Sequence, residues 1–192
     1  MPVKVESNSS YILPLDGNVF QNESNEDAQL KKPVTLSDIE QKDWMRRLLS
    51  RAKRLGDLGE VPVTAVILDA DGRCIGHGSN SRNRDCNPLG HAELIALRQA
   101  AWIKGDWRFN ECTLIVTLEP CQMCAGALIQ ARMGKVIYGT EDKKRGGMGG
   151  SIDLSSHKSA HHKMTVEGGI MKDQAKHQLE EWFKQNRLQK KN

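Results

Sequence analysis

Two short stretches of this chain, residues 91–93 and 120–124, most constrain what it can fold into. The first reads His-Ala-Glu and the second Pro-Cys-Gln-Met-Cys. Cys121 and Cys124 are three residues apart, so in a helix both sulfurs lie on one face and can bind one ion. A helix N-terminus favours thiolate, the form of cysteine that binds metals. The spacing therefore predicts a metal site where a helix begins, and Pro120 suits the first helical position.

A second helix supplies the third expected ligand. His91 opens a run of apolar residues at helical spacing over residues 92–101. Three protein ligands leave the fourth tetrahedral position for water, which is the coordination of a catalytic zinc and not of a structural one. Glu93 lies two residues after His91, close enough to carry protons without binding the ion. We therefore expect one zinc per chain, with Cys121 and Cys124 as the other ligands and Glu93 as the catalytic residue.

Each half of this pattern has a less specific interpretation. A lone Cys-x-x-Cys is also typical of a redox pair or of half of a four-cysteine structural zinc site. The other cysteines, Cys74, Cys86 and Cys112, are single and scattered, so the sequence holds no second Cys-x-x-Cys. A lone His-x-Glu indicates little. Only the combination, with proline before the first cysteine and a strand in between, favours the catalytic zinc site.

Length and composition set further limits. The chain has 192 residues, which suffices for one domain with a sizeable core. Its net charge of +4 indicates a mild attraction to polyanions. Five cysteines, an odd number without a secretory signal, favour a reducing compartment over a disulfide scaffold. Because no run of eighteen apolar residues occurs, we expect a soluble, cytoplasmic protein with no membrane segment.

The composition changes along the chain. Residues 1–35 are rich in polar residues. They have few apolar side chains and no hydrophobic periodicity, which is typical of a disordered tail. Residues 36–192 form the expected folded domain. Its first helix has capping-box spacing at Ser37 and Glu40, and cations take one of its faces. That face is typical of a solvated helix surface, and contact with RNA is the alternative.

Strand and helix signals then alternate. Strands are expected at residues 64–68, 74–79, 113–117, 135–140 and 164–166. Besides the two metal helices, a closing helix is expected over residues 173–187, with Leu179, Trp182 and Phe183 toward the core. This alternation predicts an α/β sandwich with ligands bound where strand ends meet helix starts.

The residues around the zinc motifs, and one segment before them, form longer sequence patterns that can be compared with known families. These read Glu-Val-Pro-Val at residues 60–63, Ala-Leu-Arg at residues 96–98, and Thr-Leu-Glu-Pro-Cys-Gln-Met-Cys-Ala-Gly-Ala at residues 117–127. His-x-Glu followed by Pro-Cys-x-x-Cys is the general signature of zinc nucleobase deaminases. From about residue 38 to residue 187 the chain resembles the bacterial tRNA-specific adenosine deaminases. It departs from their pattern at Thr64, at residues 89–90 and at Gly150, all of which concern the expected substrate pocket.

The resemblance implies a reaction and a fold. The reaction is hydrolytic deamination of the wobble adenosine of a tRNA anticodon to inosine, typically in an arginine tRNA with an ACG anticodon, by a homodimer. The fold is a three-layer α/β/α sandwich with a mixed central sheet of about five strands. Zinc lowers the pKa of its water to about 7. Glu93 then accepts that proton and passes protons to the adenine ring and to the departing ammonia.

Two loops carry the expected substrate contacts. Asn80 begins the polar loop that leads to His91, and loops that feed a metal helix often bind substrate. Asp142 precedes three cations, Lys143, Lys144 and Arg145. The cations can hold phosphates while Asp142 accepts a hydrogen bond from a ribose 2′-OH, the group that separates RNA from DNA. The alternative is that Asp142 caps a turn.

Two other functions remain open at this stage. One is a small-molecule nucleobase or nucleoside deaminase of the guanine or cytosine type, which has the same ligands. The other is a non-catalytic RNA-binding module stabilised by zinc, which Glu93 disfavours because a structural site needs no spare carboxylate. A second metal site at His157, His161 and His162 lacks matching ligands, so we expect these histidines on the surface or in a substrate loop.

Overall fold

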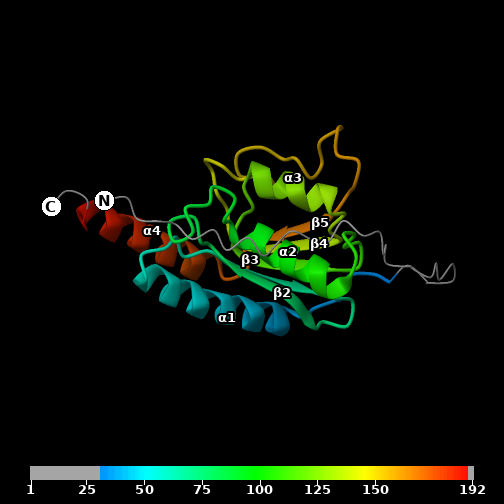
Figure 1. Cartoon of the computed structure of the whole chain (residues 1–192), viewed down its shortest axis with the longest axis horizontal. Coiled ribbons are helices and arrows are strands. Elements are labelled where there is room, and N and C mark those ends of the chain that lie inside the picture. Colours follow the sequence, from blue (N-terminus) through cyan, green and yellow to red (C-terminus); the bar gives the residue numbers. More distant parts are fainter. Residues whose placement is uncertain (1–30, 190–192) are drawn as a thin grey trace, which may run out of the picture.

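The computed structural model describes residues 31–189 (Figure 1). The helices are α1 (Asp38–Asp57), α2 (Ala92–Lys104), α3 (Gln122–Gln130) and α4 (Lys172–Gln189). The strands are β1 (Thr64–Leu68), β2 (Cys74–Ser79), β3 (Thr113–Leu118), β4 (Lys135–Thr140) and β5 (Thr165–Gly168). The strands form one five-stranded sheet in the order β2-β1-β3-β4-β5. Because β1 is antiparallel to β2 and β3 whereas β3, β4 and β5 are parallel, the expected mixed sheet is confirmed.

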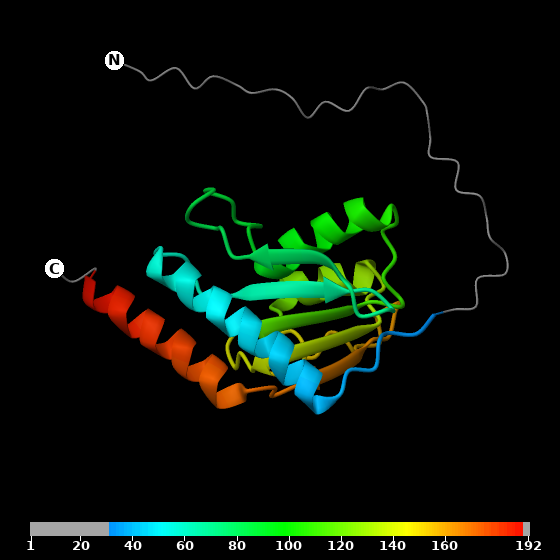
Figure 2. The ribbon, with the colours of Figure 1, turned by 90° about the horizontal axis from the view of Figure 1, so that it is seen from below.

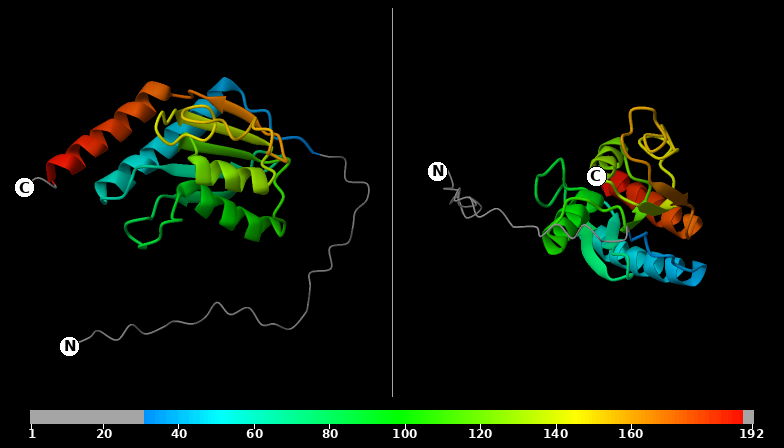
Figure 3. Two further views of the ribbon diagram at one scale, coloured as in Figure 1. Left: turned by 90° about the horizontal axis from the view of Figure 1, so that it is seen from above. Right: turned by 90° about the vertical axis from the view of Figure 1, so that its right-hand side faces the viewer.

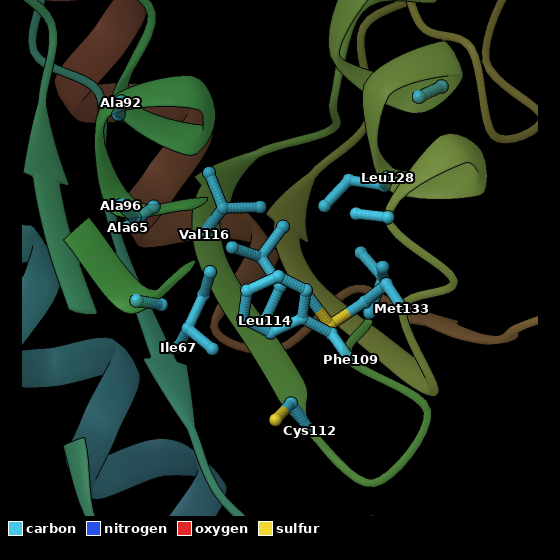
Figure 4. Packing of buried hydrophobic residues seen from close by; sticks show 14 of the residues in the cluster. Ala65, Ile67, Ala92, Ala96, Phe109, Cys112, Leu114, Val116, Leu128 and Met133 are labelled. Carbon is cyan, nitrogen blue, oxygen red and sulfur yellow. The ribbon is translucent and has the colours of Figure 1, made fainter. Parts of the chain in front are cut away.

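Helices cover both faces of the sheet, as the three-layer prediction requires (Figures 1 and 3). α2 and α3 pack on one face, and α1 and α4 pack on the other. Side chains alternate between the faces along each strand. In β1, Ala65 and Ile67 join the cluster beneath α2 and α3, whereas Val66 and Leu68 join the cluster beneath α1. Figure 4 shows Ala65 and Ile67 in the first cluster with Leu128 of α3.

Local sequence signals position α1 and the first hairpin as expected. The Ser37 hydroxyl accepts a hydrogen bond from the Glu40 N–H, and the Glu40 carboxylate accepts one from the Ser37 N–H at 2.9 Å. The two predicted strands of the hairpin have the observed bounds, and Gly72 in their turn has a φ of +78°. Such a positive φ suits glycine, which has no Cβ to clash.

α2 lies directly against β2 because two strand positions are glycines. A Cβ at Gly78 would lie 1.9 Å from the carbonyl oxygen of Ala92, and one at Gly76 would lie 2.4 Å from that of Ala96. This close approach fixes the first turn of α2, and with it the residues at the start of the helix, relative to the sheet.

The closing helix differs from the expected one in its buried face. Phe183 is 45% exposed, and Ala175, at 4%, is the residue of α4 that is fully buried. α4 instead contacts α1 along one side, where the Trp182 indole N–H donates to the Gly56 carbonyl at 3.1 Å. Leu179 and Trp182 are half-buried, but the expectation for Phe183 was wrong, because the first turns of α4, around Ala175, pack on β4 and the later turns lie beside α1.

Most of the expected tail lies outside the described residues, since the structure begins at residue 31. Val34, before the expected boundary at residue 36, packs against the core cluster beneath α1. Contacts with the domain therefore start slightly earlier than the composition predicts. Within residues 31–189, no helix combines the length and apolar character that crossing a membrane requires.

Candidate metal centre and active site

Two helix N-termini bring the three predicted metal ligands together. His91 is the N-cap of α2, and Cys121 is the N-cap of α3. The His91 Nδ1 lies 3.6 Å from the Cys121 Sγ and 3.4 Å from the Cys124 Sγ. All three ligand atoms lie within 4.8 Å of one another, and within residues 31–189 they form the only such group.

The start of α3 differs in detail from the expectation. α3 begins at Gln122, so Pro120 precedes the N-cap and does not occupy the first helical position. Cys121 has the extended backbone typical of an N-cap residue, with φ −68° and ψ 171°, and it pairs with Gly146 in an antiparallel bridge. The two sulfurs nevertheless face one point, since an N-cap residue and the third helical residue lie on the same side of the first turn.

The donor set suits zinc. Two thiolates and one imidazole are typical zinc ligands, and bond lengths of about 2.0–2.3 Å at tetrahedral angles separate the ligand atoms by roughly 3.5 Å. A hydrogen bond from Cys124, with His91 adding to it, lowers the pKa of Cys121 to about 4. The pKa of Cys124 is raised, since it is the proton donor of that pair and is buried. Three ligand atoms at this spacing therefore fit one zinc ion with a fourth position open.

Glu93 lies in the first turn of α2, beside the ligands but outside the ligand group. Its side chain is buried, and burial raises its pKa to about 7. The charge of Cys121 contributes to this rise in pKa, whereas the charge of His91 opposes it. A buried carboxylate next to three ligands matches the place that a proton carrier needs.

Comparison with known proteins agrees with this site. Residues 38–140 match a family model described as the cytidine and deoxycytidylate deaminase zinc-binding region. The chain belongs to this deaminase family. The matched region includes all three ligands and Glu93, so the deaminase is a zinc-dependent hydrolytic enzyme with one zinc site per chain.

Individual proteins within and beyond this family show which of its members the chain is similar to. The deaminase is 35% identical to a tRNA-specific adenosine deaminase of Streptococcus pyogenes serotype M18, over 80% of this chain and 96% of the relative. It is 43% identical to a tRNA(Ile)-lysidine synthase of Deinococcus radiodurans over 72% of this chain, but that match spans only 24% of the relative. A solved structure from a study of A-to-I editing by tRNA:A34 deaminases has a TM-score of 0.68 at 33% identity, over 71% of this chain and 99% of that chain.

The structure places Asn80 at the end of β2, where the loop to His91 begins. Its side chain is buried, and its Oδ1 accepts the Arg82 N–H at 3.1 Å. The Asn80 Nδ2 has no hydrogen-bond partner within residues 31–189. The loop itself is held by Glu60, whose Oε2 accepts the N–H groups of Asn83 and Arg84 at 2.9 and 3.1 Å. Asn80 is therefore on a loop with a fixed path, with one amide group still free to donate.

Asp142 begins a second loop, which adjoins the metal helix. Its Oδ1 accepts the N–H groups of Lys144 and Arg145 at 2.9 and 3.1 Å, so Asp142 does cap a turn. Both oxygens of Glu119 hold the rest of this loop. They accept the N–H groups of Asp142, Met148 and Gly150, each at 2.9 Å.

Glu60 and Glu119 are the residues that sequence reasoning missed. Both are more than nine-tenths buried, and each binds the backbone of one expected substrate loop. A signal did exist, because a carboxylate stands beside apolar residues in both Glu-Val-Pro-Val and Leu-Glu-Pro-Cys. Apart from the Val61 N–H beside Glu60, the groups that these carboxylates bind lie more than twenty residues away, so local spacing does not reveal the contacts.

The departures from the family pattern are accommodated by the fold. The Thr64 hydroxyl donates to the Leu48 carbonyl of α1 at 2.8 Å, so this side chain points away from the face with α2 and α3. A Cβ at Gly150 would lie 2.2 Å from the Glu119 Oε2, which explains why this loop position is free of a side chain here. Leu89 is 57% exposed. Of the histidines expected outside the site, His157 contacts the Ser159 hydroxyl at 2.7 Å, and His162 bonds to the Met133 carbonyl at 2.8 Å.

Proposed function

We propose that this deaminase converts the wobble adenosine of a tRNA anticodon to inosine, with an ACG-anticodon arginine tRNA as its substrate. The observation that carries the proposal is the buried carboxylate of Glu93 beside three zinc ligands. This site occurs in a chain that matches 96% of a relative named as a tRNA-specific adenosine deaminase. Adenosine and water react to inosine and ammonia, so the site must supply a nucleophile and move protons.

The residues have separate roles in this reaction. His91, Cys121 and Cys124 would hold the zinc, which when bound lowers the pKa of its water to about 7. Glu93 would take up one proton of the attacking water and pass it to the ring nitrogen next to the reacting carbon, and it would then move the remaining hydroxyl proton to the departing amine. Burial suits Glu93 to this task, because it raises the pKa of the carboxyl above its usual range, toward the neutral pH at which it must accept and release a proton.

The two substrate loops support an RNA substrate. The free amide of Asn80 can donate to the base or ribose at the site. Asp142 uses one oxygen to cap its turn, and its Oδ2 has no partner within residues 31–189, so that oxygen can accept a hydrogen bond from a 2′-OH. Lys143, Lys144 and Arg145 beside it are exposed cations. The target base must leave its stack, which costs least in an unpaired anticodon loop.

We include a homodimer and a cytoplasmic location in the proposal. All five cysteines are free thiols, as is usual in a reducing compartment. Multi-angle light scattering would test the dimer directly: the expected mass is twice that of the chain, and a monomer at assay concentrations would contradict it.

The decisive assay uses an ACG-anticodon tRNA. After incubation with the zinc-loaded protein, reverse transcription should read the wobble base as guanosine, and the Glu93→Gln variant should give unchanged adenosine. Conversion of free adenosine or guanine at the same rate as the tRNA would instead support a small-molecule deaminase.

Asp142 provides a sharper test of RNA recognition. We expect an RNA anticodon stem-loop to react faster than its all-DNA counterpart. Asp142→Asn should narrow that gap, because it removes a negative charge near the phosphates while its Oδ1 can still cap the turn. An unchanged RNA-to-DNA ratio would remove Asp142 from 2′-OH recognition.

A further inference from the structure

A large groove opens along β2, the edge strand of the sheet, between α1 and α2. Its volume is about 940 Å³, and a second hollow of about 500 Å³ along α1 shares Arg54 with it. We call the two together the arginine groove, because they are lined by Arg46, Arg47, Arg51, Arg54, Arg84 and Arg98.

The arginine groove is strongly cationic. Asp43 is the one carboxylate among its lining residues, and it pairs with Arg46. Arg84 pairs with its neighbour Asp85 at 2.8 Å. In the part of the chain that the structure describes, the four remaining arginines form no ion pair, so their charge faces solvent uncompensated.

Side chains from both helices fix the floor of the groove. The Arg51 Nε donates to the Ser79 Oγ at 2.8 Å, and the Gln99 Oε1 accepts the His77 N–H at 2.7 Å. The second contact occupies a main-chain donor on the free edge of β2, which disfavours the addition of a strand from another protein. A ligand in the groove must therefore bind the side chains that line it and not the main chain of β2.

The chemistry of the walls matches a nucleic acid strand. A guanidinium presents a planar fork of donors that matches phosphate oxygens. Trp102 of α2 also lines the groove, and its side chain is 85% exposed. An exposed indole among arginines can stack on a base while the cations bind the backbone.

The groove shares a loop with the catalytic site. Arg84, in its wall, belongs to the loop that Asn80 begins and His91 ends, and Glu60 holds that loop in place. Figure 2 shows this loop, between β2 and α2, projecting beside the C-terminal end of α1. An RNA whose anticodon lies at the zinc site can therefore pass beside this loop and extend along α1.

We propose that the arginine groove binds the phosphate backbone of the substrate tRNA outside its anticodon loop. The inference rests on the proposed function, since the occupant is the same RNA. A second copy of the chain suits this face poorly, because a two-fold interface brings each patch against itself. Six arginines would then meet six arginines.

The test compares two double variants that lose the same charge. Arg54→Gln with Arg98→Gln alters the groove, and Arg73→Gln with Arg108→Gln alters exposed cations elsewhere. Affinity for a full-length ACG-anticodon tRNA and for its isolated anticodon stem-loop is measured by fluorescence anisotropy at several salt concentrations. Thermal midpoints verify that both variants fold.

We expect the groove variant to bind full-length tRNA at least tenfold more weakly, since the loss of even one hydrogen bond to a charged group has about that effect. The slope of log affinity against log salt should fall by about 2, one for each lost phosphate contact. The isolated stem-loop should lose less affinity than the full-length tRNA. The control variant should bind both RNAs like the wild type.

Other outcomes separate the two proposals. Equal weakening in both double variants, or wild-type affinity of the groove variant, would overturn the groove proposal while leaving the tRNA activity intact. A shift of the monomer–dimer equilibrium in the groove variant alone would assign this face to a second copy and overturn it too. If the wild type neither bound nor deaminated tRNA, the proposed function itself would fail.

Discussion

At the scale of single residues, Glu93 and the three zinc ligands can be separated experimentally. The ligands are side chains of residues 91, 121 and 124, and Glu93 is outside the ligand group although it lies in the same helix as His91. Substitution of the carboxylate should therefore affect proton transfer without affecting the metal, whereas substitution of a ligand should affect both.

We predict that Glu93→Gln lowers the deamination rate by about 10²–10⁴-fold, the usual contribution of a general acid–base group. The amide is similar in size but cannot carry the proton. Elemental analysis should still find one zinc per chain, and Cys124→Ala, the control, should lose the metal. Full turnover in the Gln variant, or loss of its zinc, would contradict the proton-carrier role.

At the scale of elements, two buried glutamates attach the substrate loops to the sheet. Glu60 binds the loop after β2, and Glu119 binds the loop after β4. Each carboxylate is surrounded by main-chain N–H donors, so an amide in its place would turn an NH₂ group toward other donors. The cost of such an unsatisfied buried group is about 1–3 kcal/mol.

A crossed experiment tests these attachments. Glu119→Gln should raise amide hydrogen exchange in residues 142–150 and leave residues 80–90 near the wild-type rate. Glu60→Gln should do the reverse. In both variants the KM for tRNA should rise more than kcat falls, because a loosened loop still reaches the bound substrate. Equal changes in both loops of both variants would show a general loss of stability instead.

The contact between α2 and β2 makes a second prediction at this scale. Gly78→Ala adds a Cβ that would lie 1.9 Å from the Ala92 carbonyl oxygen, and such overpacking costs typically about 1–3 kcal/mol. Because His91 directly precedes this turn, zinc affinity should also fall. Gly126→Ala in α3 is the control: no atom lies within 4 Å of its Cβ, and stability should rise by up to about 1 kcal/mol.

Urea denaturation and zinc titration check both variants. If Gly78→Ala unfolds at the wild-type urea concentration, the close contact of strand and helix does not determine the position of His91.

At the scale of the whole molecule, the zinc site and the outer helices α1 and α4 lie on opposite faces of the sheet. The sheet and α2 and α3 build the zinc site, whereas α1 and α4 cover the opposite face (Figure 1). α4 joins α1 through few polar contacts, among them the Trp182 indole hydrogen bond to Gly56. The stability of this outer layer should therefore be sensitive to that indole but unrelated to zinc binding.

We predict that Trp182→Phe destabilises the fold by about 0.5–1.5 kcal/mol, the net contribution of a typical hydrogen bond. The same substitution at Trp102, which is 85% exposed, should change stability by less than about 0.5 kcal/mol. Thermal unfolding at saturating zinc measures both. Equal midpoints for the two variants would show that the Trp182 contact does not hold α4.

The sequence by itself determined the local elements and the chemistry of the site. The capping box of α1, the hairpin turn at Gly72 and both metal motifs are short-range signals, and the structure confirms the elements that they predict. These signals could be interpreted from the sequence because caps, turns and helical faces depend on residues at most four positions apart. The roles of Asn80 and Asp142 toward substrate stay predictions.

Only the tertiary structure decided which distant groups meet. The exposure of Phe183 depends on where α4 lies beside α1, and a bridge between Cys121 and Gly146 joins the start of α3 to a later loop. The arginine groove joins cations from α1, α2 and a loop, which are far apart in the sequence. Sequence periodicity reports which face of one element is buried, but not which surface of another element lies beside it. Packing of whole layers settles that, because burial is a property of the assembled fold.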